Sequence, residues 1–519
     1  MVTSLHNFRY NPKTFPSIRK KILSKIYPFL IAIYPVLALK NFNNAYVDLA
    51  SILRSLIIMV MITAIVWLIT YGIFRERQLS GILTSLALII ILAYGHVYIQ
   101  IEKGFGEPIR HTVLAGLFAI SFVLSCWLLI KRPSTVNSVS QFLANTALIL
   151  VLMSLGQSAV NEGNKFRAAN NLSEQNQVQA QEEASASLPD IYLIVLDGHG
   201  RSDVLKDEFG FDNSQFINGL TDMGFYVASC SQSNYASTNY SLTSMFQMDY
   251  IQLVNGKDKL PELKNTPFLE ALRTKGYSVI TFENYASGHF DLGEDLRLSR
   301  HQFALGEVDV TGGLNEFEKI MLNTSITRLF LDTEIIPGFN ENELVRLEYY
   351  EHYLQTKYIL EKLPELPQLK SPKFVFVHIL VPHIPHVFTP NGDFRYPADP
   401  SLNGYRDNAI FIDETILPVL REVIARSEKP PVIILMGDHG PPATNFTSPE
   451  TRMKNLEAYF VDATAKSKLY TSITPVNSFR IILDEYFGSD YPLLDDVSYY
   501  AYQLRQLKNA PTIIENTCK

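Results

Sequence analysis

Acidic and histidine side chains stand at the ends of three apolar runs in the C-terminal half of the chain. Asp197 follows IYLIVL, and Asp438 and His439 follow VIILMG. His378 lies near the end of KFVFVHIL, and His383 and His386 come shortly after it. Apolar runs of this length, bounded by turn residues and separated by helix-like stretches, are typical of buried strands in a parallel α/β sheet. Because ligand chemistry collects at the carboxyl ends of such strands, we expect these side chains to converge at one edge of the sheet.

Two of these segments have the chemistry of a catalytic metal site. Such a site needs carboxylate and imidazole ligands together with an open position for the substrate. Asp197, Asp438 and His439 supply two carboxylates and one imidazole nitrogen. We therefore expect them to bind one divalent metal ion, with a side-chain hydroxyl completing the ligand set.

The hydroxyl is expected from the segment SQSNYASTNYSLTSMF, residues 231–246. We assign Thr238 as the nucleophile and a metal ligand, with Ser237 and Ser241 as local competitors. A threonine hydroxyl is a weak nucleophile near neutral pH, but a divalent cation stabilises its alkoxide and neutralises charge on a phosphoryl or sulfuryl group. The expected mechanism is covalent: a phosphothreonine forms and then passes its group to an alcohol or to water.

Each segment also has a purely structural interpretation. An Asp-Gly pair at a strand end is most often a turn, and this applies to Asp197. The Ser/Thr/Asn cluster is compatible with a solvated loop, and His383 and His386, which flank Pro385, are compatible with surface positions. Their joint occurrence at successive strand ends favours a catalytic site.

The pattern around these residues predicts an α/β domain over residues 188–490. The runs at 190–197, 224–229, 277–282, 373–380 and 431–438 are expected strands of a mostly parallel central sheet, and 341–363 and 407–426 are expected helices. After about Gly488 no core pattern is recognisable, so residues 491–519 are assigned to a C-terminal tail.

The first part of the chain consists mainly of apolar runs, and a bilayer-spanning helix needs about 20 consecutive apolar residues. Residues 51–73, 79–101, 112–130 and 139–160 each predict a span, and 23–40 predict a shorter fifth that Pro28 and Pro35 interrupt. Residues 1–160 are therefore expected to form an all-α transmembrane bundle. Residues 161–187 are polar without apolar periodicity and predict a linker or a short surface helix.

The distribution of basic residues predicts the orientation, because cytoplasmic loops are enriched in Lys and Arg. Basic residues precede the first span and also occupy the loops at 75–77 and 131–132, which lie on one side if there are five spans. We expect a multi-pass protein of the plasma (inner) membrane, with a cytoplasmic N-terminus and an extracytoplasmic or periplasmic catalytic domain. No cleavable signal peptide is expected.

Charge and cysteine content exclude two other classes of site. The net charge of −7 comes without a basic stripe, so we expect no nucleic-acid partner. The three cysteines provide neither a disulfide framework nor zinc-finger spacing, and they allow at most one bridge, Cys230 to Cys518.

Four segments, in this order, resemble the membrane-bound sulfatase-like proteins of the alkaline phosphatase superfamily, which include the lipoteichoic acid synthases and the phosphoethanolamine transferases. They are PDIYLIVLDG (189–198), the Thr238 segment, HILVPHIPHVFTPNG (378–392) and ILMGDHGP (434–441). The resemblance covers the whole architecture, five spans followed by a catalytic domain of the alkaline phosphatase (sulfatase) type. TNYSLTSMF (238–246) is similar to the nucleophile segment of the phosphoethanolamine transferases, which favours Thr238 over Ser237.

The resemblance also implies roles for the remaining site residues. It places the metal on Asp197, Thr238, Asp438 and His439, and favours zinc or manganese, with magnesium and calcium as alternatives. It places His378 and His383 near the leaving or accepting group, so we expect His383 to donate a proton to the leaving group. We expect His378 and His386 to contact the substrate. YRDNAIFID (405–413) and TPVNSFRIILDEYFG (474–488) resemble family segments too, without giving chemistry directly.

The sequence departs from these families at three points. The phosphoethanolamine transferases are rich in disulfides in the catalytic domain and this chain is not, which weakens the assignment of substrate by analogy with them. The first metal ligand is Asp197, where both transferase groups have Glu. The formylglycine motif of true sulfatases, Cys or Ser followed by x-Pro-x-Arg, has no counterpart here, which disfavours hydrolysis of sulfate esters.

We therefore expect a metal-dependent, membrane-anchored transferase. It would move a phospholipid headgroup phosphate, of the phosphoglycerol or phosphoethanolamine type, through Thr238 to an extracytoplasmic glycan or lipid acceptor. One alternative is a hydrolase of phosphate or sulfate esters that uses the same site with water as acceptor. Another is a non-catalytic membrane sensor or scaffold, against which the intact set of site residues argues.

Overall fold

The computed structural model describes residues 14–42, 50–105, 111–179, 188–254, 260–283, 290–300, 314–333, 341–442, 448–502, 506–507 and 512–518. The chain divides into two compact units. The first comprises Met1–Ala168 and Leu314–Val345, and the second comprises Ala169–Gly313 and Arg346–Lys519. Residues 314–345, which the sequence pattern assigns to the catalytic domain, thus contribute to the first unit.

Five long helices form most of the first unit, and each contains a segment long and apolar enough to cross a membrane. They are α1 (Thr14–Phe42), α2 (Leu53–Phe74, preceded by η1, Ala50–Ile52), α3 (Arg77–Phe105), α4 (His111–Lys131) and α5 (Pro133–Gln179). The five expected spans are therefore confirmed as helices, and α1 remains helical through Pro28 and Pro35. Helix α5 continues beyond the apolar span to Gln179, so residues 161–179 of the expected linker are helical. The rest of that linker, residues 180–187, lies outside the described residues.

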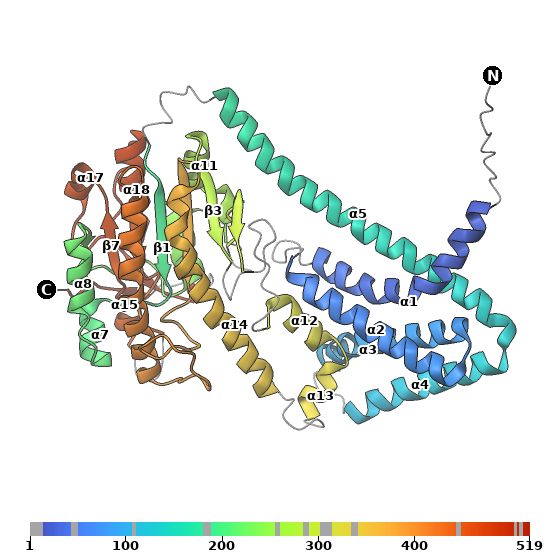
Figure 1. Cartoon of the computed structure of the whole chain (residues 1–519). Coiled ribbons are helices and arrows are strands. Elements are labelled where there is room, and N and C mark those ends of the chain that lie inside the picture. The colour runs from blue at the N-terminus through green and yellow to red at the C-terminus, as the bar shows by residue number, and fades with distance from the viewer. Residues whose placement is uncertain are drawn as a thin grey trace, which may run out of the picture. The chain divides into compact units, whose positions relative to one another are not determined.

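Two short helices from the middle of the chain pack against the membrane helices within the first unit. They are α12 (Glu316–Thr324) and α13 (Thr327–Thr333), the yellow segments near α3 in Figure 1. The Ile326 N–H donates to the Ile91 carbonyl over 2.7 Å, and Gly95 allows the close approach, because a Cβ there would meet the Thr324 backbone. Glu318 forms an ion pair with Arg54 of α2, which fixes α12 on the bundle.

The second unit is built on a seven-stranded sheet in the order β2-β7-β6-β1-β5-β3-β4. The strands are β1 (Ile191–Leu196), β2 (Tyr226–Val227), β3 (Ser278–Phe282), β4 (Leu296–Leu298), β5 (Lys373–Ile379), β6 (Val432–Met436) and β7 (Glu457–Phe460). Strands β6, β1, β5, β3 and β4 are parallel to one another, and β7 pairs antiparallel with β6 and β2. The expected mostly parallel sheet is confirmed. The sequence pattern missed β4 and β7, which are short.

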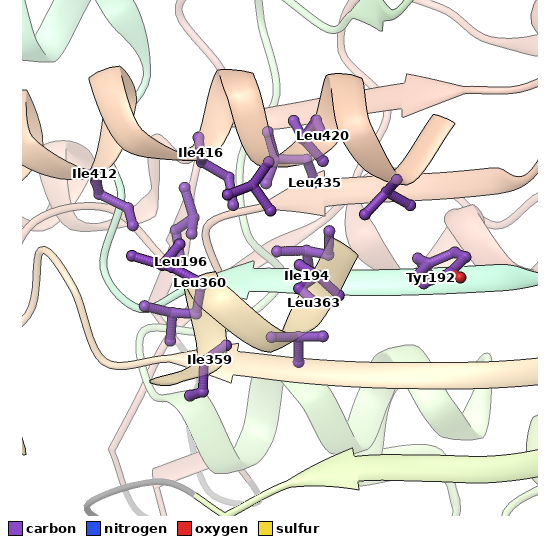
Figure 2. Packing of buried hydrophobic residues seen from close by; sticks show 14 of the residues in the cluster. Tyr192, Ile194, Leu196, Ile359, Leu360, Leu363, Ile412, Ile416, Leu420 and Leu435 are labelled. Carbon is purple, nitrogen blue, oxygen red and sulfur yellow. The ribbon is translucent and has the colours of Figure 1, made fainter. Parts of the chain in front are cut away.

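Both faces of this sheet are covered by helices, which explains why its central strands are apolar throughout. Alternate residues of β1 enter two different cores: Tyr192, Ile194 and Leu196 lie in one, and Ile191, Leu193 and Val195 in the other. The first core is completed by α8 (Ser214–Asp222), the later turns of α14 (Glu341–Lys362), η4 (Leu363–Gln368) and α15 (Leu402–Arg426). Figure 2 shows Ile412, Ile416 and Leu420 projecting from α15 toward the strands.

The second core is completed by α9 (Thr238–Gln247), α11 (Pro267–Thr274) and α18 (Pro475–Phe487), with α18 labelled near β1 in Figure 1. Because Leu242, Met245 and Phe246 of α9 belong to this core, the helix that begins at Thr238 packs on this face of the sheet. The unit also contains shorter helices: α7 (Ser202–Phe209), α10 (Ile251–Val254), η2 (Leu263–Asn265), α16 (Pro449–Met453) and α17 (Ala463–Lys468).

The end of the chain folds back onto the second unit. Strands β8 (Ser498–Tyr500) and β9 (Thr512–Ile514) form a two-stranded antiparallel sheet, and Tyr499 stacks on Tyr235, which lies three residues before Thr238. Cys230 and Cys518 form a disulfide with a Cα–Cα distance of 5.5 Å. This is the one bridge that the sequence analysis allowed. Three-residue strands lack a recognisable alternation, which is why the sequence shows only a tail here.

Candidate active site

Three neighbouring strands bring acidic and histidine residues to one sheet edge. Strand β1 lies between β6 and β5, so the residues that follow or end these strands become neighbours. Asp197 follows β1 directly, His378 is the penultimate residue of β5, and Asp438 comes two residues after β6. One ligand atom from each lies within 4.8 Å of the others, and all three side chains are buried. The expected convergence at the sheet edge is present.

The imidazole of His439 joins this group to the predicted nucleophile. Its Nε2 lies 3.3 Å from Asp438 Oδ2 and 3.7 Å from Asp197 Oδ1. The same nitrogen lies 3.2 Å from Thr238 Oγ1. The four residues predicted to hold a metal ion therefore meet around one atom, and His378 adds a further imidazole through a 3.1 Å contact between its Nε2 and Asp197 Oδ2.

The carboxylates of this group have oxygen atoms that a cation would satisfy. Asp197 Oδ1 and Asp438 Oδ2 are buried and accept no hydrogen bond from the residues that the structure describes. A buried, unpaired carboxylate oxygen is strongly unfavourable unless a positive charge lies beside it. Because both oxygens lie near His439 Nε2, the residues fit a divalent cation with mixed oxygen and nitrogen ligands.

The electrostatic environment gives these groups the ionisation states that metal ligands need. Burial acts to raise the pKa of the Asp197 carboxyl, but the imidazoles of His383 and His378 outweigh it and lower the pKa below its usual range. Burial, reinforced by the nearby Arg452 guanidinium, lowers the pKa of His439 to about 4. Near neutral pH, Asp197 is therefore ionised and His439 is neutral.

Thr238 is the first residue of α9, where backbone N–H groups and the helix dipole favour negative charge. The preceding Ser237 has an extended backbone and makes no side-chain capping hydrogen bond. Ser241, one turn further along α9, is fully buried, and its hydroxyl has no hydrogen-bond partner among the described residues. Of the three hydroxyls considered from the sequence, that of Thr238 is the one in contact with His439.

Sequence reasoning missed Arg452, a buried arginine of α16. Its Nη2 donates to His439 Nε2 over 2.8 Å, and its Nε donates to the Ala236 carbonyl over 2.9 Å. Its Nη1 reaches the carbonyls of Gly440 and Pro441 at 3.3 and 3.2 Å. The guanidinium therefore links the segment before Thr238 to the segment after Asp438. An isolated arginine in PETRMKN gives no sequence signal for this position.

Helix α15 holds the turn that carries Asp197, which gives the YRDNAIFID segment a structural role. The Tyr405 hydroxyl donates to the Gly198 carbonyl over 2.9 Å and accepts from the Gly200 N–H over 3.0 Å. Gly198 has a φ of +72°, which favours glycine, and its N–H donates to Asp438 Oδ1 over 2.9 Å. This last bond connects the two carboxylate segments directly.

A second contact from α15 fixes the same turn on its other side. His199 Nε2 lies 2.7 Å from Asp413 Oδ1, and both side chains are buried. Asn408 accepts a hydrogen bond from the Phe388 N–H over 3.1 Å and thus holds the end of the segment that contains His383 and His386. The sequence resemblance marked this helix without indicating what it does.

The two remaining predicted histidines are held by backbone hydrogen bonds. The backbone N–H of His383 donates to the Asp197 carbonyl over 3.0 Å, and the centre of the His383 ring lies 6.3 Å from that of His439. His386 is buried, with its Nδ1 2.6 Å from the Asp399 carbonyl, and burial lowers its pKa to about 4. The predicted contact of His386 with substrate stays a prediction.

Most of the C-terminal part of the chain is similar to proteins of a known family. Residues 189–474 match the model of the Sulfatase family. No curated protein matches the sequence. Among solved structures, the C-terminal periplasmic domain of EcEptC from Escherichia coli is similar, with 11% identity, a TM-score of 0.41, and coverage of 64% of this chain and 93% of that one.

Two further solved structures are also similar to this chain. The C-terminal periplasmic domain of phosphoethanolamine transferase EptC from Campylobacter jejuni has 13% identity, a TM-score of 0.36, and coverage of 58% of this chain and 90% of that one. The soluble domain of lipooligosaccharide phosphoethanolamine transferase A from Neisseria meningitidis has 15% identity, a TM-score of 0.34, and coverage of 57% and 87%.

Proposed function

The chain belongs to the sulfatase family, and on that premise we propose that it is a metal-dependent membrane transferase that acts through Thr238. Its donor is a phospholipid whose headgroup phosphate, of the phosphoglycerol or phosphoethanolamine type, is transferred. Its acceptor is an extracytoplasmic glycan or lipid. The family contains both phosphotransferases and hydrolases. Of these two reactions, we propose phosphotransfer from a phospholipid to a glycan or lipid.

One observation carries the proposal: the Thr238 hydroxyl lies at the first turn of α9, 3.2 Å from His439 Nε2. Beside it are buried oxygens of Asp197 and Asp438 that accept no hydrogen bond within the described part of the chain. A divalent cation held by Asp197, Asp438 and His439 would supply the positive charge that stabilises a threonine alkoxide and a phosphoryl group. Mixed carboxylate and imidazole ligands suit zinc or manganese better than magnesium or calcium.

Arg452 supports a phosphoryl rather than a purely structural site. Its Nη2 now donates to the Nε2 lone pair of His439. If His439 Nε2 served as a metal ligand, this guanidinium would be available to an anionic substrate oxygen, for which Arg has a suitable planar fork of donors. Together with the N-terminus of α9, it would stabilise the charge that develops during transfer.

In the first half of the reaction, the Thr238 oxygen forms a bond to the donor phosphorus as the bond from phosphorus to the diacylglycerol oxygen breaks. The Thr238 proton leaves to solvent, and His383 gives a proton to the departing oxygen. His383 Nδ1 lies 2.9 Å from the Ile384 carbonyl, which assigns the N–H to Nδ1 and leaves Nε2 as the atom that exchanges protons. The products are diacylglycerol and phosphothreonine that carries the headgroup.

The membrane helices and the disulfide support the choice of donor and compartment. Five apolar helices tether the site to a bilayer, where phospholipid headgroups are abundant. The Cys230–Cys518 disulfide favours an oxidising compartment, as does the distribution of basic residues among the loops between spans. Both observations support a catalytic unit on the extracytoplasmic side.

The test is intact-mass analysis of the full chain in detergent, with bound metal, after incubation with phosphatidylethanolamine or phosphatidylglycerol. We expect an adduct of one headgroup phosphate on the wild type and none on Thr238→Ala. The control is Ser241→Ala, since the Ser241 hydroxyl makes no described hydrogen bond. Release of free headgroup phosphate without any gain from an added alcohol would support the hydrolase instead, and a metal-loaded protein without an adduct or product would refute catalysis.

A further inference from the structure

The turn between α12 and α13 packs against two of the apolar helices within the first unit (Figure 1). Ile326, in this turn, donates its backbone N–H to the carbonyl of Ile91 of α3 over 2.7 Å. Ile326 and Leu329 also share a hydrophobic cluster with Leu114 and Phe118 of α4. A segment that the sequence pattern assigns to the catalytic domain therefore contacts residues inside two apolar spans.

The length of α4 indicates how deep this turn lies in a bilayer. Helix α4 has 21 residues and thus spans about 31 Å, close to the roughly 30 Å of a hydrocarbon core, and no charged residue lies between its two terminal residues. His111, its first residue, therefore lies at one boundary of the core, which we call the outer boundary. Leu114 and Phe118 lie roughly 5 and 10 Å below that boundary, by the rise of the helix. The turn that packs with them lies at a similar depth.

Helix α3 gives nearly the same depth independently. Arg75 and Arg77 mark the opposite boundary, because a charged side chain is costly inside the hydrocarbon core. Ile91 lies about four helical turns, or about 21 Å, from Arg77, so it is about 9 Å short of the outer boundary of a core of about 30 Å. Gly95, one turn further along α3, leaves room for the approach, since a Cβ there would lie 2.4 Å from the backbone of Thr324.

The break between α12 and α13 is closed by hydrogen bonds within the protein. The Ser325 N–H donates to the Leu322 carbonyl, and the Ile326 N–H donates to α3. The Thr324 hydroxyl donates to the Ile320 carbonyl over 2.8 Å, and the Ser325 hydroxyl donates to the Leu322 carbonyl over 3.1 Å. Non-helical backbone at bilayer depth is tolerated only where the protein satisfies its polar groups. These groups of the turn meet that requirement.

Acidic residues toward the far ends of the two helices form ion pairs near the outer boundary. Glu318 pairs with Arg54, the second residue of α2, and Asp332 Oδ2 lies 3.0 Å from His111 Nε2. The turn itself, residues 320–327, carries no charge. The hairpin therefore has charged ends at the boundary and an uncharged turn below it, which is the distribution that immersion in a leaflet requires.

Arg328 is the charged residue nearest to the turn, and its side chain is also paired. Its Nε lies 2.7 Å from Asp332 Oδ2, and its guanidinium lies 5.4 Å from the centre of the Tyr98 ring. Long basic side chains near a membrane boundary extend in this way toward the headgroups, while their apolar stems stay in the hydrocarbon. The charge of Arg328 is thus compatible with a turn below the boundary.

We propose that α12 and α13 form a re-entrant hairpin in the outer leaflet, and that its partner is the acyl chains of the phospholipids there. Lipid is favoured over a protein partner because Val113 and Leu117, at the same depth on α4, are exposed apolar residues, so that the hairpin continues the apolar belt of the spans. The chain before and after residues 314–345 belongs to the second unit. That unit is therefore attached to the bilayer through this hairpin as well as through α5, whatever reaction Thr238 performs.

Spin labels measure the depth of the turn in the full chain, reconstituted into vesicles of phosphatidylethanolamine and phosphatidylglycerol. Cys126→Ser removes the free cysteine and leaves the disulfide in place. In this background a nitroxide is attached to Leu322→Cys or to Asn323→Cys, two neighbouring half-buried positions of the turn. Collisions with oxygen, which enters the hydrocarbon, are compared with collisions with a nickel chelate, which stays in water.

Three reference positions calibrate these collisions. Val113→Cys and Leu124→Cys are exposed positions of α4, the first near the outer boundary and the second deep in the core. Lys206→Cys, an exposed charged position of α7, gives the value for a label in water. We expect at least one label in the turn to lie at a depth between those of Val113 and Leu124. Labels that meet the chelate as often as the one at Lys206, or labels shielded from both reagents by protein, would overturn the proposal.

A second measurement uses the wild-type chain, because a cysteine at a packed position could disturb the hairpin. A phosphatidylethanolamine with a diazirine on its acyl chain is incorporated into the same vesicles and activated by light, and the crosslinked peptides are mapped by mass spectrometry. We expect crosslinks in residues 314–333 as well as in α4, which is the internal control. Crosslinks in α4 without any in residues 314–333 would show that acyl chains do not reach the hairpin and would refute the proposal.

Discussion

The hydroxyl of Thr238 and the imidazole of His439 are in contact at 3.2 Å, although 201 positions separate the two residues in the chain. The contact exists because α9 begins beside the sheet edge where β6 ends. Each residue reaches the contact from a rigid element: Thr238 from the first turn of a helix, and His439 from the segment directly after a buried strand. The nucleophile and the metal ligand that we propose, held in this way, would need little rearrangement before reaction.

Replacing Thr238 should abolish chemistry and leave the fold intact. We expect Thr238→Ala to lower the rate of headgroup transfer at least about 10³-fold, because it removes the atom that forms the covalent intermediate. Thr238→Ser should retain partial activity, since it keeps a hydroxyl at the same backbone position. Diacylglycerol release from labelled phospholipid measures both rates. Activity of Thr238→Ala near that of the wild type would transfer the role to another hydroxyl, with Ser237→Ala as the next variant to examine.

Much of this site is predictable because its residues follow strands that are buried on both faces. The runs before Asp197 and Asp438 are continuous and apolar, and these positions converge whenever the strands are parallel neighbours. Arg452 was not predictable, because its contact with His439 depends on how α16 returns to the sheet. Strand β7 was missed for a related reason: it has four residues, and its first residue is the buried acid Glu457.

The first unit shows a different limit of sequence reasoning. Residues 316–333 read as ordinary short helices of a soluble domain, and their hydropathy does not mark them as partners of membrane helices. Their place is set by paired contacts, such as Glu318 with Arg54 and Asp332 with His111, whose members lie over 200 positions apart. A single sequence does not reveal such pairs, whereas the five spans are visible from length and hydropathy alone.

Removal of metal should lower the stability of the wild type more than it lowers the stability of the Asp438→Asn variant. A bound cation stabilises the folded state by about 2.7 kcal/mol when its concentration is 100 times its Kd. Asp438 is a suitable ligand, because its buried Oδ2 has no hydrogen-bond partner among the described residues. Without metal, Asp438→Asn should be at least as stable as the wild type, because it removes a buried charge while its Oδ1 can still accept from the Gly198 N–H. Thermal unfolding of the full chain with chelator, zinc and manganese measures both effects. An equal gain in Tm from metal in both proteins would exclude Asp438 as a ligand.

Arg452→Lys should slow formation of the covalent intermediate without loss of metal. Lysine keeps the positive charge but lacks the planar fork that can bind two oxygens, so we expect a decrease of about 10²-fold in the rate of adduct formation. The control is Lys454→Ala, whose side chain contacts Asp203 rather than the site. Metal content and Tm distinguish this outcome from a structural defect. A variant that loses metal together with activity would show that Arg452 serves mainly to position His439.

Stability should depend on pH through Glu457, a fully buried carboxyl whose pKa burial raises to about 8 despite hydrogen bonds from Tyr459, Ser478 and Asn455. In the unfolded chain its pKa is near 4.5. The folded state therefore binds the proton more tightly, so this contribution is full below about pH 4.5 and is lost as pH rises to about 8. The slope is at most about 1.4 kcal/mol per pH unit.

Glu457→Gln isolates this effect, because the amide cannot ionise. We expect the variant to unfold at about the same temperature as the wild type near pH 4 and at a higher temperature near pH 8. Thermal unfolding across this range measures the difference between the two curves. Parallel curves for the two proteins would mean that Glu457 is ionised in the folded state throughout, contrary to the effect of burial.

Thiol labelling tests both the disulfide and the compartment of the second unit. The chain has three cysteines, of which Cys230 and Cys518 are paired and Cys126 is free. Protein from cells lysed in denaturant with a maleimide should therefore label at one site without reductant and at three sites after reduction. Cys518→Ser should label at two sites without reductant, because it frees Cys230. Because disulfides persist in oxidising compartments and are rare in the cytosol, labelling of three sites in unreduced wild type would place the second unit on the cytoplasmic side. That result would reverse the orientation inferred from the basic loops, and would also remove extracytoplasmic glycans from the possible acceptors.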